Sequence, residues 1–187
     1  MDMPEQASDD ELIAATLEGQ LEAFDQLMER YQGFVYRLAF GFGRSHDNAL
    51  DVSQAVFLKV FRKLASFGGR SSFRTWLAKV VYHEGLNWQR ANRRHAEGHE
   101  ELVETVDSSG LRQDEQLLVN ERFEGILKGL ARLNRRYRTA VELRYFHGLP
   151  VREIAVVLEC SEGVAKNALF RGVRTLRNHL SEAGVGA

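Results

Sequence analysis

The stretch of sequence that decides the fold is residues 150–177, PVREIAVVLECSEGVAKNALFRGVRTLR. Its first part has apolar residues at helical spacing, which predicts a helix with one apolar face. That face contains Val151, Ile154, Ala155 and Leu158. Only Glu159 and Cys160 separate this helix from Ser161, a residue type that favours the N-cap of a following helix. The stretch therefore predicts two helices joined by a tight turn.

The second helix of this pair divides its residues between two faces. We expect its buried face to contain Val164, Ala165, Ala168 and Leu169. Its polar residues then point elsewhere: Lys166, Asn167, Arg171 and Arg174. Two short helices, the second with polar side chains on one side, are a means of placing side chains in a DNA major groove. An ordinary helical hairpin with a solvated basic face remains the alternative for this segment alone.

Composition favours an all-α fold. The chain has 187 residues, 44% of them hydrophobic and only two of them proline, and no run of alternating β-branched residues predicts a sheet. Cys160 is the only cysteine, so no internal disulfide is expected, and we interpret it as a small buried side chain. The start of the chain is acidic and no apolar run is long enough to span a bilayer. We therefore expect a cytoplasmic protein without membrane insertion.

The net charge of −1 conceals a segregated pattern. Residues 1–61 hold eleven acidic and four basic side chains, whereas residues 62–94 hold eight basic and one acidic. Residues 95–124 hold nine acidic and two basic side chains, and residues 125–180 hold eleven basic and four acidic. An even mixture would indicate a solvated surface. Two basic blocks in a neutral chain instead favour two separate contacts with a polyanion.

Hydrophobic periodicity predicts two groups of helices. The first group comprises helices at 9–18, 21–42, 48–65 and 73–94, with breaks at Gly41, Gly43 and Ser45 after the second of them. The second comprises helices near 114–131 and 134–147, followed by the pair in 150–177. Residues 95–112 are polar and acidic and lack this periodicity, which is typical of a linker. We expect two small helical domains, 1–94 and 113–187, joined by a flexible acidic tether.

The end of the first domain, residues 70–94, places cations beside aromatic rings. This combination suits partly single-stranded nucleic acid, because bases stack on rings while phosphates contact the cations. We interpret Trp76 as a core residue, since Phe73, Leu77 and Val80 share its face. Trp88 lies among polar residues and is as well explained by a surface position.

Three separated motifs resemble the sigma-70 family, and more closely its small two-domain group of extracytoplasmic-function (ECF) sigma factors. They are DVSQAVFLKVFRKL (51–64), FGGRSSFRTWL (67–77) and LRYFHGLPVREIAVVLECSEGVAKNALFRGVRTLR (143–177). The resemblance implies a non-enzymatic subunit, without cofactor or metal, that binds the clamp coiled coil and flap of core RNA polymerase. It implies recognition of two promoter DNA elements, opening of the DNA between them, and control by an anti-sigma factor. The first domain would then be sigma region 2 and the second sigma region 4.

The resemblance also implies residue roles. Residues implied to bind core polymerase are Asp51, Gln54, Phe57 and Leu58. Those implied to recognise and melt the −10 element are Phe67, Arg70, Ser72, Arg74, Asn87, Trp88, Arg90, Arg93 and Arg94. Those implied to contact the −35 element are Ser161, Gly163, Lys166, Asn167, Arg171 and Arg174.

This chain departs from the family pattern at several of these positions. It has His83 and Asn87 where the group often has Asn and Asp, and Glu84 is unusual in so basic a helix. Val164 replaces a common Thr and Ala168 a common Arg, changes that we expect to remove DNA contacts.

Other functions explain less of the chain. A stand-alone helix-turn-helix regulator would account for residues 134–180 but would leave residues 48–94 without a role. An inhibitory protein-binding bundle would not need two basic blocks. His95 and His99 have the spacing of a metal pair but no third ligand nearby, and we expect no metal site. Asp9, Asp10 and Glu11 are better explained by a helix start than by paired catalytic carboxylates.

Overall fold

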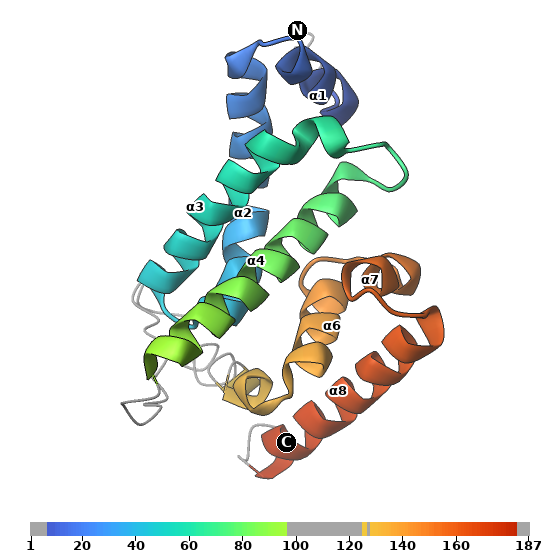
Figure 1. Ribbon diagram of the computed structural model, residues 1–187. Coiled ribbons are helices and arrows are strands. Elements are labelled where there is room, and N and C mark those ends of the chain that lie inside the picture. The colour runs from blue at the N-terminus through green and yellow to red at the C-terminus, as the bar shows by residue number, and fades with distance from the viewer. Residues whose placement is uncertain (1–6, 97–124, 127, 183–187) are drawn as a thin grey trace, which may run out of the picture. The chain divides into compact units, whose positions relative to one another are not determined.

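The computed structural model describes residues 7–96, 125–126 and 128–182 (Figure 1). Every regular element in these ranges is a helix, which confirms the all-α prediction. The elements are α1 (Asp9–Leu17), α2 (Leu21–Gly43), α3 (His46–Lys63), the short 3-10 helix η1 (Leu64–Ser66), α4 (Phe73–Ala96), α6 (Arg135–Tyr145), α7 (Val151–Val157) and α8 (Glu162–Glu182). Residues 125–126 and 128–132 are also helical.

The chain divides into two compact units. The first comprises residues 1–43 and 47–95, and the second comprises residues 44–46 and 96–187. Residues 97–112, most of the expected linker, lie outside the described residues, as does most of the helix expected near 114–131. That the first unit is sigma region 2 and the second sigma region 4 is the prediction from the sequence.

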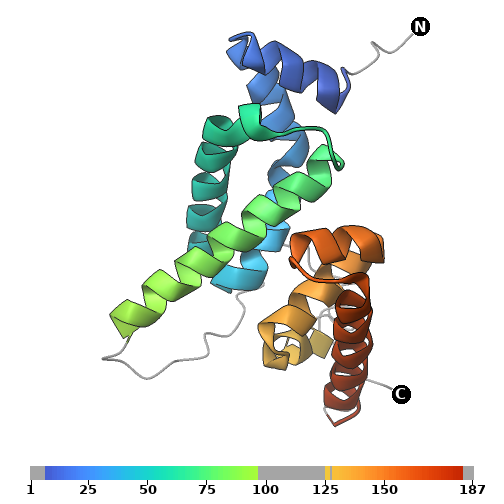
Figure 2. The same ribbon diagram turned by 45° about the vertical axis from the view of Figure 1, so that its right-hand side comes forward.

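Helices α2, α3 and α4 form the body of the first unit (Figures 1 and 2). Their apolar faces supply its fully buried side chains, among them Leu27, Leu38, Val56, Leu77 and Val81. Gly85 allows α4 to approach α2 closely, because a Cβ atom at this position would lie 2.3 Å from Cγ of the Phe42 ring. Such packing, with the density of an organic crystal, fixes the relative positions of the three helices.

Helix α1 is fastened to α2 through polar contacts. Ser8 and Glu11 form a capping box, in which each side chain satisfies the backbone N–H of the other residue. Arg30 of α2 forms an ion pair with Asp9 at 2.6 Å, and the Tyr31 hydroxyl donates a hydrogen bond to the same carboxylate. The acidic cluster at the start of α1 is therefore explained by helix capping, as expected from the sequence, and by a contact with α2 that the sequence did not reveal.

The second unit packs α6 and α7 against α8. Asn134 caps α6 by accepting a hydrogen bond from the backbone N–H of Tyr137 at 3.0 Å. The interhelical approach is close at Gly172, where a Cβ atom would lie 2.7 Å from Cγ2 of Val141. Val141 belongs to a core cluster with Leu130 and Leu133, against which further apolar residues of α8 pack. The long helix α8 is thereby held along one side, and its other side remains exposed.

Several helix boundaries differ from the predicted ones. Helix α2 continues through Gly41 to Gly43, because a glycine inside a long amphipathic helix lowers its stability without ending it. Helix α3 begins at His46 and ends in the 3-10 turn η1, instead of spanning 48–65. Helix α8 continues past residue 177 to Glu182.

Candidate nucleic-acid and polymerase interfaces

The loop before α4 ends at a defined helix start. The Ser72 hydroxyl accepts a hydrogen bond from the backbone N–H of Thr75 at 3.2 Å and lies 2.8 Å from the Thr75 hydroxyl. Ser72, rather than Ser71, is therefore the N-cap, although the sequence left both open. Gly69 supports the turn with a φ of 64°, which favours glycine. Arg70 is exposed in this loop.

An aromatic cluster anchors the loop. The rings of Phe67, Phe73 and Trp76 contact one another, with centroids 5.6 to 5.7 Å apart. Phe73 is buried, and Phe67 and Trp76 are half-buried. Edge-to-face and tilted ring contacts of this kind stabilise a fixed arrangement. The ring of Phe67 therefore holds the loop against α4, and Trp76 has the packing role that its neighbours in the sequence indicated.

The outer face of α4 brings together only some of the expected −10 residues. Asn87 and Arg90 are exposed and lie with the half-buried His83 at helical spacing on one side of the helix. Arg74 does not join this group, because its guanidinium carbon lies over the Phe34 ring of α2, 5.0 Å from the ring centroid. Trp88 is half-buried. Arg93 and Arg94 lie within α4, but their side chains are outside the described residues.

Glu84, the unusual acid of this helix, forms an ion pair with Lys59 of α3. Only 16% of the Glu84 side chain is exposed, and 33% of the Lys59 side chain. The amide of Asn87 donates a long hydrogen bond of 3.4 Å to the same carboxylate oxygen. The Glu84 carboxylate therefore links α4 to Lys59 of α3, and it also contacts the exposed side chain of Asn87.

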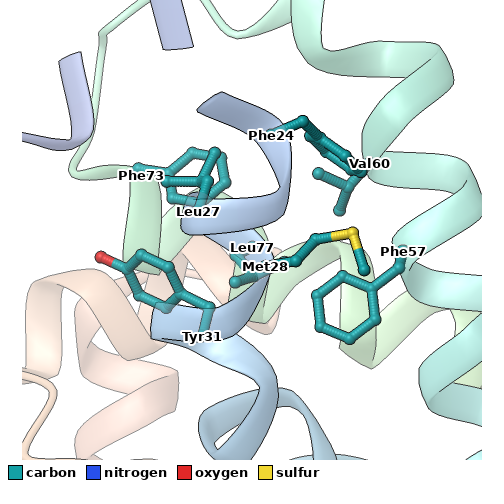
Figure 3. Close-up of a pocket in the computed structure, with 8 residues that line it drawn as sticks. All are labelled: Phe24, Leu27, Met28, Tyr31, Phe57, Val60, Phe73 and Leu77. Atoms are coloured by element: carbon teal, nitrogen blue, oxygen red, sulfur yellow. The ribbon is translucent and has the colours of Figure 1, made fainter. Parts of the chain in front are cut away.

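Helix α3 carries an exposed stripe on the side away from the core. Asp51, Gln54 and Leu58 lie on it at spacings of three and four residues and are exposed, Leu58 by 60%. Phe57 departs from this group and is half-buried. It lines a pocket among α2, α3 and α4, with its ring beside Met28 (Figure 3).

Phe61 extends the α3 stripe and was not among the residues expected to bind polymerase. It follows Leu58 by three residues and is 49% exposed. One edge of its ring contacts Phe24 of α2, with centroids 5.1 Å apart. In the sequence, its spacing from Gln54 and Leu58 already indicated that Phe61 lies on the same side of the helix. The stripe of Asp51, Gln54, Leu58 and Phe61 is called the α3 surface below.

The helix-turn-helix has the geometry that its sequence predicted. Helices α7 and α8 are separated by four residues, of which Glu159 adopts a left-handed conformation with φ 51°. The Ser161 hydroxyl accepts a hydrogen bond from the backbone N–H of Val164 at 3.4 Å, which confirms its capping role. Ala155 and Ala165 are buried, consistent with close packing of the two helices. Cys160 is partly buried in the turn.

The exposed face of α8 contains the residues expected to contact the −35 element. Those with exposed positions are Ser161, Gly163, Lys166, Asn167, Arg171 and Arg174. Arg171 also donates a hydrogen bond of 3.4 Å to the Tyr137 hydroxyl of α6, which restricts its guanidinium group. Phe170 lies among these residues with 67% of its surface exposed, one turn from Lys166 and from Arg174. We did not expect it from the sequence, although its spacing from these cations was visible there.

The buried face of α8 differs from the predicted one at Val164. Val164 was expected to be buried, but it is 42% exposed, because the buried face of α8 runs through Ala165, Ala168 and Gly172. Ala168 was expected on the buried face, which is confirmed, because it is 2% exposed and faces the core. A long side chain at position 168 would have to leave that core to contact DNA. Of the two departures from the family pattern within α8, Val164 lies on the exposed surface and Ala168 does not.

Comparisons with known proteins match both units. A family model for sigma-70 region 2 matches residues 27–95, and one for sigma-70 region 4 matches residues 123–176. The ECF RNA polymerase sigma-E factor of Escherichia coli strain K12 is 31% identical over 184 residues, covering 94% of this chain and 96% of that protein. The chain belongs to the ECF sigma factors. The ECF sigma-E factor of Haemophilus influenzae is 28% identical and covers 95% of this chain and 98% of its own length.

Two solved structures share the fold. The sigma factor RpoE of Bartonella quintana, in complex with the anti-sigma factor NepR, has a TM-score of 0.69 at 21% identity, covering 84% of this chain and 96% of its own. CnrH, in complex with the cytosolic domain of CnrY, has a TM-score of 0.67 at 23% identity, covering 91% and 96%. In the protein described here, the region 2 match includes the α3 surface and nearly all of α4. The region 4 match includes α6, α7 and most of α8.

Proposed function

We propose that this sigma factor binds core RNA polymerase through the α3 surface. The supporting observation is that Leu58 and Phe61 are exposed on the same stripe as Asp51 and Gln54. An exposed apolar stripe with polar neighbours suits an amphipathic partner helix, such as one from the clamp coiled coil of the polymerase. Phe57 then supports this surface from within, through its packing near Met28. The polymerase flap is proposed as a second contact, made by region 4.

The two basic surfaces are proposed to bind the two promoter elements. The exposed face of α8 suits the duplex of the −35 element, because a recognition helix projects its polar side chains into the major groove. The loop 67–72 and the outer face of α4 suit the −10 element, where Arg70 and Arg90 neutralise phosphate and Asn87 contacts a base edge. Domain boundaries of 1–94 for region 2 and 113–187 for region 4, with a linker of 95–112, belong to this proposal.

Further aspects of the function follow from the family. We assign no catalytic step to the chain, because RNA synthesis is the chemistry of the polymerase that it would direct. No helix among the described residues has the length and apolarity needed to cross a membrane. We propose that the protein acts in the cytoplasm, where its polymerase and promoter DNA are found. We also propose an anti-sigma partner, such as the one that RpoE of Bartonella quintana carries in its solved complex.

Run-off transcription with purified core polymerase tests the proposal. Promoters would be selected from a random library with the reconstituted holoenzyme, and each selected promoter would then be transcribed with and without this protein. We expect specific transcripts only when both protein and core are present. Specific footprints by the protein alone, with no specific transcript from any selected promoter, would instead support a stand-alone helix-turn-helix regulator.

A further inference from the structure

The starting observation is the position of Glu84 on α4. It is the only acidic residue between residues 62 and 94, a segment that otherwise carries eight basic side chains. Its carboxylate is held from α3, because Nζ of Lys59 donates a hydrogen bond to Oε1 and forms an ion pair with it. The pair is largely withdrawn from solvent, and such a charge-assisted bond is directional. The Glu84 carboxylate is therefore fixed in place.

Asn87 lies one helical turn beyond Glu84, on the same side of α4. Its Nδ2 atom donates to Oε1 of Glu84 at 3.4 Å. A carboxylate offers only acceptors, so an amide next to it must turn its NH2 group toward it and its carbonyl oxygen away. The side chain of Asn87 is itself exposed. Glu84 thus selects one of the two orientations of an amide that is accessible to a ligand.

This orientation carries information for base recognition. In the major groove, adenine and cytosine present an amino group, whereas guanine and thymine present a keto oxygen at the corresponding position. An amide oxygen directed toward the base accepts a hydrogen bond from an amino group and repels a keto oxygen. The second N–H of the amide remains able to donate to N7 of adenine, as in the bidentate pairing of asparagine with adenine.

We propose that Glu84, held by Lys59, is a positioning residue that makes Asn87 prefer an amino base over a keto base at one position of the downstream promoter element. The inference rests on the proposed function, in which Asn87 contacts that element. Lys59 has two effects: it fixes the carboxylate, and it neutralises a charge that would otherwise repel phosphate. The specificity of α4 therefore depends on a lysine of α3, the helix that also carries the proposed polymerase surface.

The test measures base preference in the holoenzyme. A selected promoter is made in versions that carry each of the four bases at each position of its downstream element, and open complexes are quantified for wild type, Glu84→Gln and Asn87→Ala. The matched control is Lys63→Met, which removes an exposed positive charge one helical turn along α3 from Lys59. Affinity for core polymerase is measured in parallel for each variant. A general change in DNA affinity alters all promoter versions alike, whereas a change in amide orientation alters only the ratio at one position.

We expect the wild type to favour adenine and cytosine over guanine and thymine by about tenfold at one position. Asn87→Ala should abolish this ratio, and Glu84→Gln should reduce it several-fold with core affinity unchanged, because glutamine accepts either orientation of the Asn87 amide. Lys63→Met should leave the ratio intact.

Three results would overturn the inference in distinguishable ways. If Asn87→Ala changes the ratio but Glu84→Gln does not, Glu84 has no positioning role and the proposed DNA-binding site stands. A wild-type preference for keto bases at the position controlled by Asn87 would refute the proposed orientation of the amide but not the contact of Asn87 with DNA. If Asn87→Ala leaves every base preference unchanged, the proposed contact of Asn87 with the downstream element fails, and the inference fails with it.

Discussion

The hydroxyl group of Tyr31 on α2 donates a hydrogen bond of 2.5 Å to the carboxylate of Asp9 on α1. The Tyr31 ring also makes an edge-to-face contact with Phe73, the first residue of α4, with centroids 5.2 Å apart. One side chain thus joins the first helix of region 2 to the start of the helix proposed to bind DNA. Burial and the Asp9 hydrogen bond both raise the pKa of Tyr31 well above its usual value, so the hydroxyl keeps its proton.

Tyr31→Phe should therefore loosen α1. The substitution keeps the ring contact with Phe73 but leaves Asp9 without this donor, and a hydrogen bond to a charged group contributes about 1.5–3 kcal/mol. We expect faster hydrogen–deuterium exchange in α1 and a correspondingly lower free energy of unfolding for region 2. Tyr145→Phe is the control, because Tyr145 is exposed at the end of α6. Equal exchange of α1 in both variants would show that the Tyr31 hydroxyl does not hold the helix.

Gly85→Ala should destabilise region 2. The added methyl group would lie 2.3 Å from the buried Phe42 ring, so α2 and α4 would have to separate, and overpacking of this kind costs about 1–3 kcal/mol. Gly33→Ala is the matched control in α2, where the new Cβ atom would meet only the movable end of Arg37. There the better helix propensity of alanine should make the change neutral or stabilising by up to about 1 kcal/mol. Calorimetric unfolding of both variants compares them, and equal effects would contradict close packing at Gly85.

Leu58→Ala and Phe61→Ala should each weaken binding to core polymerase. Apolar side chains at the centre of an interface commonly contribute 1 kcal/mol or more, so we expect an affinity loss of about tenfold. Leu21→Ala is the control, because Leu21 is 58% exposed at the start of α2, outside the α3 surface. Competition titration against labelled sigma factor measures the affinities. An equal loss for all three variants would mean that the α3 surface is not the specific contact.

Phe170→Ala should reduce recognition of thymine in the upstream element. Phe170 is exposed among the cations of α8, and an apolar side chain in the major groove contacts the thymine methyl group. Replacing each upstream thymine by uracil removes only that methyl group. We expect one such replacement to lower transcription by wild type but not by Phe170→Ala, whereas the control Phe146→Ala, exposed outside α8, should respond like wild type. A variant that still responds to uracil would exclude Phe170 from this contact.

The capping box should make the end of α1 sensitive to acid. Hydrogen bonds from the backbone and side chain of Ser8 lower the pKa of Glu11 below its ordinary value of 4.5. A carboxyl group with a lowered pKa stabilises the folded state above its unfolded pKa, and this contribution is lost as pH falls through the folded pKa. Exchange of the first α1 amides should therefore accelerate as pH falls below 4.5, beyond the intrinsic pH dependence of exchange. Glu11→Gln should remove this additional step, and its persistence would assign the step to another group.

Local chemistry in the sequence was sufficient for the helices and for the helix-turn-helix. Apolar spacing located α1 to α4 and α6 to α8, and Ser161 predicted the cap of α8, because both signals depend on residues within a few positions of each other. The choice between Ser71 and Ser72 stayed open until the hydrogen bond from Thr75 was seen. The same local signals failed at Gly41, where packing of a long helix outweighed the low helix propensity of one residue.

The sequence by itself determined an all-α chain of the sigma-70 type and which segments carry basic side chains. Only the tertiary structure decided which side chains on those segments are exposed. Val164 and Phe170 are exposed whereas Ala168 is buried, because the direction from which α6 and α7 pack selects the buried face of α8. Likewise, Glu84 is an unexplained acid in the sequence and becomes a partner of Lys59 only when α3 lies beside α4. Such contacts join residues far apart in the chain, and no local pattern encodes them.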